Sequence, residues 1–231
     1  MKILSITTSS SICGVAILEN TSLIKEISID KWLTHSEVLM PLIKEIFDET
    51  NLNLKDIDLL SVDIGPGSFT GIRIGIATIK AFVDSLNIKS IGVNSLEALS
   101  LNVDNHGIIC SLIDARKENV YCEIFEKIGN KYLSRRKASF ENINELLTEL
   151  KEINPEYLIT FVGDGAVKNK EKILSILPNS QFAYNNRLSP VNVGLCAFNF
   201  FNEERETSIE PLYLRKSEAE QKLEEKSNGQ Q

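Results

Sequence analysis

A glycine-rich segment, GPGSFTG at 65–71, has the composition of a loop that could bind a phosphate. It lies between an apolar run and a segment with helical periodicity, and a helix N-terminus that follows such a turn is a common anion site. The segment has no lysine and does not match GxxxxGK[ST], so it is not a P-loop. Ser68 could act as a nucleophile, but capping of the following helix by Ser68 or Thr70 explains the sequence more simply.

The rest of the chain offers no established catalytic or metal-binding pattern. The two histidines, His35 and His106, have no second histidine or cysteine at metal-ligand spacing, and neither GxSxG nor HExxH occurs. The four cysteines lie far apart without a CxxC pair, which favours reduced buried thiols over a disulfide frame or a zinc site. We therefore predict no catalytic residue, no metal site and no cofactor.

The composition indicates a cytoplasmic protein that does not bind nucleic acid by itself. The chain has 231 residues and a formal net charge of −7, whereas phosphate contacts need clustered lysine and arginine. The only dense basic segment, KYLSRRK at 131–137, is better explained as a solvated strand or turn than as an RNA site. No apolar run reaches the roughly 20 residues that span a bilayer. The first residues also lack the features of a signal peptide.

The elements that position these segments occur in the same order twice. The first half has predicted strands at 2–7, 14–18 and 22–29, a helix at 35–50, a strand at 57–65, a helix at 70–86, a strand at 88–93 and a helix at 95–102. The second half has predicted strands at 107–115, 119–128 and 131–140, a helix at 141–153, a strand at 157–165, a helix at 168–177, a strand at 181–184 and a helix at 191–202. Both halves read β-β-β-α-β-α-β-α, the topology of the actin, sugar-kinase and Hsp70 superfamily with its ribonuclease H-like α/β fold.

This topology divides the chain into four parts. We expect an N-terminal, partner-binding half at 1–104, a second and degenerate half at 105–190, a C-terminal helix and closing segment at 191–215, and a mobile tail at 216–231.

Proteins of this superfamily bind ATP between the halves, with a carboxylate for magnesium and glycines in two hairpin turns. In the first turn, ITTSSSICG, Thr7 stands at the carboxylate position. In the second turn, IDARKENVY, Asp114 is present but Arg116 and Lys117 replace the glycines. GDGA at 163–166 resembles part of an adenosine-binding turn, although an ordinary loop at a strand end is the interpretation we favour.

Two helices carry more apolar or small residues than contact with one sheet requires. The helix at 35–50 is apolar over about half its circumference, more than the usual stripe of roughly 100°. The helix at 70–86 has an isoleucine-rich stripe and, beside it, a stripe of small residues that includes Gly75. A glycine inside a helix costs roughly 1 kcal/mol relative to alanine, and close packing of another helix would offset that cost. Either the two helices pack deeply on each other or they form a dimer face, which we favour.

Together these segments resemble the bacterial TsaB (YeaZ) family of tRNA threonylcarbamoyladenosine biosynthesis. GPGSFTGIRIG followed by DAR is a specific combination, and the matching segments run in the family's order from Lys2 to Arg215. They are KILSITTSS, GVAIL, HSEVLMPLI, DIGPGSFTGIRIGIATIKAF, GVNSLEAL, IDARKENVY and PLYLR.

The resemblance implies a non-catalytic paralogue of TsaD. TsaD transfers a threonylcarbamoyl group onto the adenosine beside the anticodon of tRNAs that read A-starting codons. It binds its metal through His-x-x-x-His, and Ser95 and Leu99 occupy those two positions here. A serine and a leucine cannot hold an iron or zinc ion there. The family usually has Asp-Thr-Ser in the first strand, whereas this chain has Thr7-Thr8-Ser9, which further weakens magnesium or nucleotide binding.

The resemblance also implies the partners. It implies a heterodimer with TsaD, recruitment of the ATPase TsaE, a homodimer when the chain is alone, contact with tRNA only through the complex, and no membrane. A nucleotide at the subunit junction is not supported by this chain's residues. In the family the contact is a bundle of the helices that correspond to 35–50 and 70–86. The predicted partner interface therefore comprises His35, Leu39, Ile43, Phe47, Gly71, Ile74, Gly75, Thr78 and Ala81.

Two other functions stay open. The duplicated topology suggests an ATP-dependent small-molecule kinase, but Thr7 and the second hairpin without glycine argue against it. A protease is the other alternative, because relatives of the family have been described in that way. It needs a nucleophile with a base, or a metal, and His35 is better explained as a helix cap or an interface residue.

Overall fold

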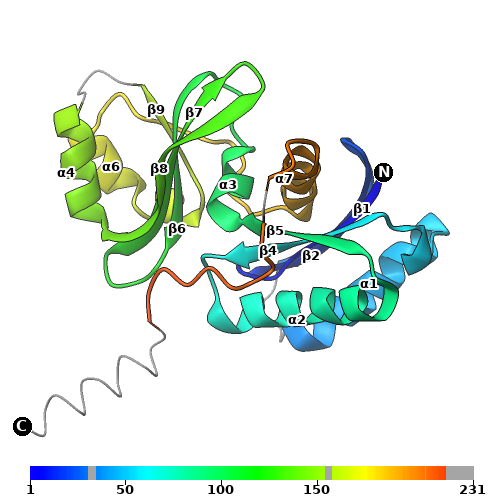
Figure 1. Ribbon diagram of the computed structural model, residues 1–231. Coiled ribbons are helices and arrows are strands. Elements are labelled where there is room, and N and C mark those ends of the chain that lie inside the picture. Colours follow the sequence, from blue (N-terminus) through cyan, green and yellow to red (C-terminus); the bar gives the residue numbers. More distant parts are fainter. Residues whose placement is uncertain (31–34, 154–157, 206, 217–231) are drawn as a thin grey trace, which may run out of the picture.

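The computed structural model describes residues 1–30, 35–153, 158–205 and 207–216, and its elements follow the predicted order (Figure 1). The first half contains β1 (Lys2–Thr7), β2 (Ile12–Glu19), β3 (Ser22–Asp30), α1 (His35–Thr50), η1 (Leu54–Asp56), β4 (Leu59–Gly65), α2 (Phe69–Leu86), β5 (Lys89–Asn94) and α3 (Ser95–Ser100). The second half contains β6 (Gly107–Asp114), β7 (Asn119–Ile128), β8 (Lys131–Asn142), α4 (Ile143–Ile153), β9 (Ile159–Val162), α5 (Asp164–Lys168), α6 (Lys170–Ile176), β10 (Gln181–Phe182) and α7 (Pro190–Asn202).

The two sheets have the same strand order. The first sheet runs β3-β2-β1-β4-β5, and the second runs β8-β7-β6-β9-β10, so each strand has a counterpart in the other half. In both sheets the first three strands are antiparallel neighbours, and the last two strands add in parallel. This arrangement confirms the predicted α/β fold of two tandem halves.

The central strands are buried on both faces. β1, β2 and β4 are almost continuous apolar runs, as expected for strands that are covered by helices on both sides. Helices α1 and α2 cover the outer face of the first sheet, and α4 and α6 cover the outer face of the second (Figure 1). Leu39, Ile43 and Ile72 are buried at the first of these contacts.

Helices α3 and α7 lie between the sheets and join the two halves. Helix α3, the last of the first half, packs on β6 and β7, whereas α7, the last of the second half, packs on β1 and β2. One core cluster therefore contains Val93 from the first sheet, Phe125 from the second and Val193 from α7. Because this core is shared, we expect the two halves to fold as one cooperative unit.

The structure corrects the predicted elements around 157–177. The strand expected at 157–165 is β9, which has four described residues and ends before Gly163, whose φ of +107° favours glycine. The helix expected at 168–177 is divided into α5 and α6 at Asn169, whose side chain donates to the Gly165 carbonyl at 2.8 Å. Residues 154–157 and 217–231, the latter including almost all of the tail predicted at 216–231, lie outside the described residues.

Helix α2 begins where the sequence predicted a cap. Ser68 is the N-cap residue, and its Oγ accepts from the Gly71 N–H at 3.2 Å. The other end of the helix is capped by Asn87, which adopts the left-handed conformation with a φ of 53°. Ile72, Ile76 and Ile79 face the sheet, as their spacing predicted.

Candidate functional site

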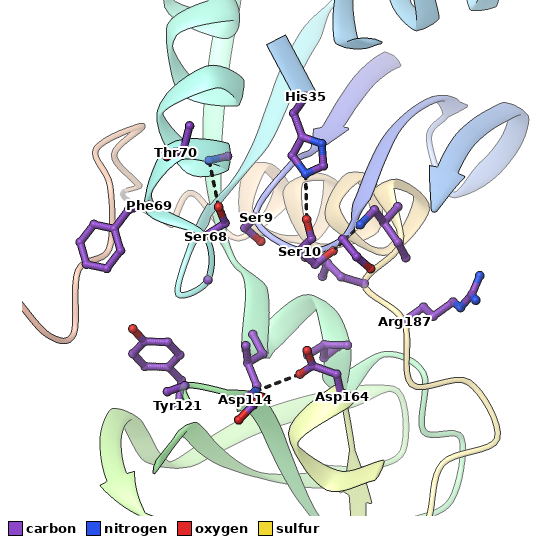
Figure 2. A pocket seen from close by; sticks show the side chains of 18 of the residues that line it. Ser9, Ser10, His35, Ser68, Phe69, Thr70, Asp114, Tyr121, Asp164 and Arg187 are labelled. Carbon is purple, nitrogen blue, oxygen red and sulfur yellow. Dashed lines mark hydrogen bonds between the residues drawn. The ribbon is translucent and has the colours of Figure 1, made fainter. Parts of the chain in front are cut away.

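A cleft of about 1030 Å³ separates the two halves (Figure 2). The wall from the first half consists of the β1–β2 turn, the start of α1 and the start of α2. The wall from the second half consists of the β6–β7 turn, the loop into α5 and the loop before α7. Figure 2 labels Ser9, Ser10, His35, Ser68, Phe69 and Thr70 on the first wall, and Asp114, Tyr121, Asp164 and Arg187 on the second side.

A buried carboxylate organises the first turn, and it was missed from the sequence. Asp63, at the end of β4, is fully buried. It accepts hydrogen bonds from Thr7 Oγ1 at 2.9 Å, from the Thr8 N–H at 3.2 Å, from the Ser9 N–H at 3.3 Å and from Ser9 Oγ. Burial raises the pKa of Asp63, and these four donors oppose the rise.

These contacts bear directly on nucleotide binding. In an ATP site of this fold, the N–H groups of the first turn must reach phosphate oxygens. Here the N–H groups of Thr8 and Ser9 are directed to Asp63, and the carboxylate lies beneath the turn rather than among the residues that line the cleft. Asp63 reaches the turn because β1 and β4 are parallel neighbours with Ile6 opposite Val62, a pairing that the sequence alone does not show.

The second turn uses side chains where an ATP site would have glycines. Arg116, Lys117 and Glu118 all have left-handed backbone conformations, with φ of 65°, 51° and 59°. The Asp114 carboxylate accepts from the Arg116 N–H at 3.0 Å and from Lys168 Nζ at 2.7 Å. Both oxygens of the Asp114 carboxylate therefore bind groups of the same chain. Arg116, Lys117 and Glu118 carry large side chains at positions where an ATP site needs the bare backbone of glycine close to the phosphates.

The glycines of GDGA have a role inside the chain. A Cβ on Gly163 would lie 2.1 Å from the Leu112 carbonyl oxygen, and a Cβ on Gly165 would lie 3.0 Å from the Leu112 carbonyl carbon. Both glycines thus let α5 pack closely on β6. The structure therefore corrects the interpretation of this segment as an ordinary loop, because Asp164–Lys168 form α5 and Gly163 is the N-cap residue of that helix.

Ser95 and Leu99, which the family resemblance aligns with the two metal-binding histidines of TsaD, are both buried. Ser95 is fully buried, and its Oγ lies 3.1 Å from Ser9 Oγ. Leu99 is buried in the core between the sheets. In the described part of the chain, no group of three or more histidine, cysteine, aspartate or glutamate side chains is arranged to hold a metal ion.

The structure does not pair Ser68 with a histidine. Ser68 Oγ accepts from the helix backbone as a cap, and His35 Nε2 donates to the Ser10 carbonyl at 2.8 Å. The structure thus places His35 at the start of α1 as an anchor for the first turn. His106 is exposed in the loop before β6. Within the described residues the geometry of a serine nucleophile with its base is not formed.

The structure divides the nine predicted interface residues into two groups. Leu39, Ile43, Gly71 and Gly75 are buried inside the chain. His35, Phe47, Ile74 and Thr78 are half-buried and Ala81 is exposed, so these five have surface available to a partner.

Gly75 needs a different explanation from the one predicted. Its Cβ would lie 2.5 Å from Thr8 Oγ1 and 3.1 Å from Val62 Cγ2, and a Cβ on Gly71 would lie 1.9 Å from the Thr8 carbonyl oxygen. The two glycines therefore accommodate the first turn of the same chain rather than a second helix. The prediction that Gly75 allows another part of the protein to approach closely was right, but the neighbour is the first turn of the same chain and not a second helix.

The strip of α2 that solvent reaches consists instead of the half-buried Ile74 and Thr78 and the exposed Ala77, Ala81 and Ser85. None of these five residues is charged. Thr78 Oγ1 donates to the Ile74 carbonyl at 2.9 Å, and Ser85 Oγ donates to the Ala81 carbonyl at 2.7 Å. With its hydroxyl groups turned onto its own backbone, this strip presents a smooth and largely apolar surface.

Basic side chains on α2 and in the segment 131–137 have partners within the chain. Arg73 and Lys80 on α2 contact the C-terminal segment, through Tyr213 and Glu210. In the segment 131–137, which forms part of the edge strand β8, Arg135 pairs with Glu126, and Arg136 pairs with Glu141 and Glu149. Two of the four basic residues in that segment, Arg135 and Arg136, are thus paired with acidic neighbours, which does not favour an RNA site.

No helix in the described ranges is both long and apolar enough to cross a membrane.

The fold and the cleft define the class of protein. Two tandem β-β-β-α-β-α-β-α halves with a cleft between them are the architecture of the actin and sugar-kinase superfold. A ROK hexokinase from Thermus thermophilus shares it with a TM-score of 0.53 and 8% identity, over 88% of this chain and 100% of that one. At this identity the likeness concerns the fold alone.

Closer relatives identify the family. The family model for TsaD, described as tRNA N6-adenosine threonylcarbamoyltransferase, matches residues 32–222. The Bacillus subtilis (strain 168) protein named "tRNA threonylcarbamoyladenosine biosynthesis protein TsaB" is 30% identical over 229 residues, which cover 96% of this chain and 97% of that protein. The protein of the same name from Haemophilus influenzae is 26% identical over 237 residues, with 96% and 97% covered. The structure of YeaZ from Pseudomonas aeruginosa matches with a TM-score of 0.71 and 19% identity, over 92% and 99%. The chain belongs to the TsaB (YeaZ) family.

Proposed function

We propose that the chain is a non-catalytic subunit of the system that makes threonylcarbamoyladenosine beside the anticodon of tRNAs reading A-starting codons. The names of its relatives support the pathway. The state of the cleft supports the absence of catalysis, because Ser95 and Leu99 are buried in core contacts and the N–H groups of the first turn bind Asp63.

The uncharged strip on α2 is the observation that carries the partner-binding role. Burial of Ile74, Thr78 and Ala81 against another protein would leave no hydroxyl unpaired, since the threonine is already bonded to its own helix. Met40 on α1, the helix that contacts α2, is 50% exposed and adds apolar surface. An apolar centre next to the charged residues of α1, such as Lys44 and Asp48, has the composition of a protein interface with a polar rim.

The partner is a TsaD-like catalytic subunit, bound through α1 and α2. When the chain is alone, the same surface forms a homodimer, because an apolar strip of this kind can pair with a second copy of itself. The TsaE ATPase joins the assembled complex. Contact with tRNA occurs only through the complex, in keeping with a net charge of −7 and with the internal pairing of the basic segment in β8.

Two matched threonines test this surface. Thr78 on α2 and Thr148 on α4 both donate a hydroxyl to the carbonyl four residues earlier, at 2.9 Å and 2.8 Å. Thr78→Arg places a long charged side chain in the strip, whereas Thr148→Arg makes the same change on the outer face of the second half. We expect Thr78→Arg to weaken binding to a TsaD relative by at least about tenfold, which is roughly 1.4 kcal/mol.

The readout is calorimetric titration, supported by size-exclusion chromatography of the isolated chain for homodimerisation. Thr148→Arg should bind like the parent protein. If both variants bind TsaD with the parent affinity, α2 is not the contact surface and the proposed interface is wrong.

A further inference from the structure

The residues that follow α7 return across both halves of the molecule. In Figure 1 this segment passes from α7 along the first sheet and the start of α2 towards the second sheet. Residues 203–205 and 207–216, the described part of this segment, form no regular helix or strand, so their position depends on individual contacts. Residues 208–215, here named the clasp, make those contacts.

The clasp is fixed to the first half by backbone and aromatic contacts. The Leu212 N–H donates to the Ile64 carbonyl at 2.8 Å, at the end of β4. The Tyr213 ring stacks on Phe69, with 4.7 Å between ring centroids and 17° between planes. Arg73 Nε donates to the Tyr213 hydroxyl at 2.7 Å. Stacked aromatic pairs of this kind add stability beyond the apolar area that they bury.

The very next residues are fixed to the second half. Leu214 packs into a small core cluster of Ala115 and Tyr121 from the second half and Leu96 from α3, the helix that packs on β6 and β7. Arg215 Nη1 donates to the Ala115 carbonyl at 3.2 Å, and its guanidinium carbon lies 5.8 Å and 5.7 Å from the ring centroids of Tyr121 and Phe140. An arginine within about 6 Å of two aromatic ring centroids is a favourable cation–π arrangement.

No residue separates the last contact with the first half from the first contact with the second half. Tyr213 is held by one half and Leu214 by the other, and a residue spans at most about 3.6 Å even when fully extended. A hollow of about 330 Å³ lies beneath the clasp and is lined by residues from both halves, among them Gly92 and Glu123. At this place the halves are therefore joined by the Asn94 side chain, which donates to the Glu123 carboxylate, and by the clasp.

The anchors also belong to the cleft. Phe69, Tyr121 and Arg215 all line it. We propose that residues 208–215 clasp the two halves together and set the width of the cleft. Release of either anchor lets the walls separate by more than the present geometry permits. The device is independent of the proposed partner and of the pathway, since it requires only the contacts within this chain.

Distance measurement between spin labels on the two walls tests the clasp. Ser36 on α1 and Val167 on α5 are exposed and line opposite walls, so Ser36→Cys with Val167→Cys provides the two labels. The four native cysteines are buried and will not be labelled in the folded protein. In this background we compare the parent with Arg215→Ala and Tyr213→Ala, using the full chain. Each variant should broaden the distance distribution and shift it to longer distances by at least about 3.5 Å, the reach of one residue.

Glu210→Ala is the matched control, because the Glu210 carboxylate pairs with Lys80 at 2.6 Å on the first half alone. It should leave the distribution unchanged. The proposal is overturned if both anchor variants remain folded by circular dichroism and keep the parent distribution, or if Glu210→Ala widens the cleft equally. If an alanine variant does not fold, Arg215→Lys replaces it. This change keeps the charge but loses the planar guanidinium, and its distance distribution is then compared with those of the parent and of Glu210→Ala in the same way.

Discussion

Replacement of Gly75 by alanine tests the packing of the first turn against α2. The Cβ of the new alanine would lie 2.5 Å from Thr8 Oγ1 and 3.1 Å from Val62 Cγ2. Thr8 Oγ1 is itself buried and donates to the Gly71 carbonyl at 2.8 Å. Alanine therefore has no room unless the threonine hydroxyl moves and gives up that hydrogen bond.

The expected size of the effect follows from three contributions. Alanine in place of glycine inside a helix stabilises by about 1 kcal/mol. Loss of the buried hydrogen bond costs about 1–3 kcal/mol, and overpacking costs about 1–3 kcal/mol. The unfavourable contributions are larger, so we expect Gly75→Ala to lower the free energy of unfolding by about 1–5 kcal/mol.

Urea denaturation of the single and double variants isolates the cause. In the Thr8→Ala background the nearest atom of residue 8 is its Cβ, at 3.8 Å, so the cost of Gly75→Ala should fall by at least about 1 kcal/mol. Ala77→Gly, at an exposed position of the same helix, should lower the free energy of unfolding by about 1 kcal/mol both in the parent and in the Thr8→Ala background. The reasoning is refuted if Gly75→Ala stabilises the otherwise unchanged chain, or if its cost is the same in both backgrounds.

Three further predictions concern the cap, the buried carboxylate and the cleft. Ser68→Ala removes the N-cap of α2 and should lower the free energy of unfolding by about 1 kcal/mol in urea, with a smaller loss for Ser68→Gly. Burial raises the pKa of Asp63 above its unfolded value, so the folded state binds the proton more tightly. The contribution of this proton binding by Asp63 to the free energy of unfolding is fully present below the pKa of the unfolded state and is lost as the pH rises through the pKa of the folded state. The parent should therefore lose stability relative to Asp63→Asn with rising pH, by at most about 1.4 kcal/mol per pH unit; parallel pH profiles of the two proteins would contradict this. Calorimetric titration of the isolated chain with Mg-ATP should show no tight stoichiometric binding, because Thr8 and Ser9 direct their N–H groups to Asp63; a tight one-to-one isotherm would revive the kinase alternative.

Much of the architecture could be predicted because it depends on local pattern. The helix at 35–50 was predicted with the same bounds as α1, since its apolar periodicity is strong and continuous. The cap at Ser68 was predictable from residue type and position. The repeated order of elements then gave the topology of both halves, and the two sheets confirm it.

The features that could not be predicted depend on contacts between distant residues. Asp63 and Thr7 are separated by 56 positions, and only the pairing of β1 with β4 brings them together. A glycine such as Gly75 indicates that another part of the protein approaches closely, but its residue type does not identify that neighbour as Thr8. The C-terminal segment has no periodicity, so the stacking of Tyr213 on Phe69 gave no signal in the sequence.

Reconstitution of tRNA modification tests the central claim most directly. Unmodified tRNA is incubated with ATP, bicarbonate and labelled threonine, together with relatives of TsaD and TsaE and the enzyme that supplies the threonylcarbamoyl adenylate. Incorporation is measured with and without this chain. We expect labelled tRNA only when the chain and the TsaD relative are both present, and none when the chain replaces that subunit. Robust transfer by the chain in the absence of the TsaD relative would contradict a non-catalytic role.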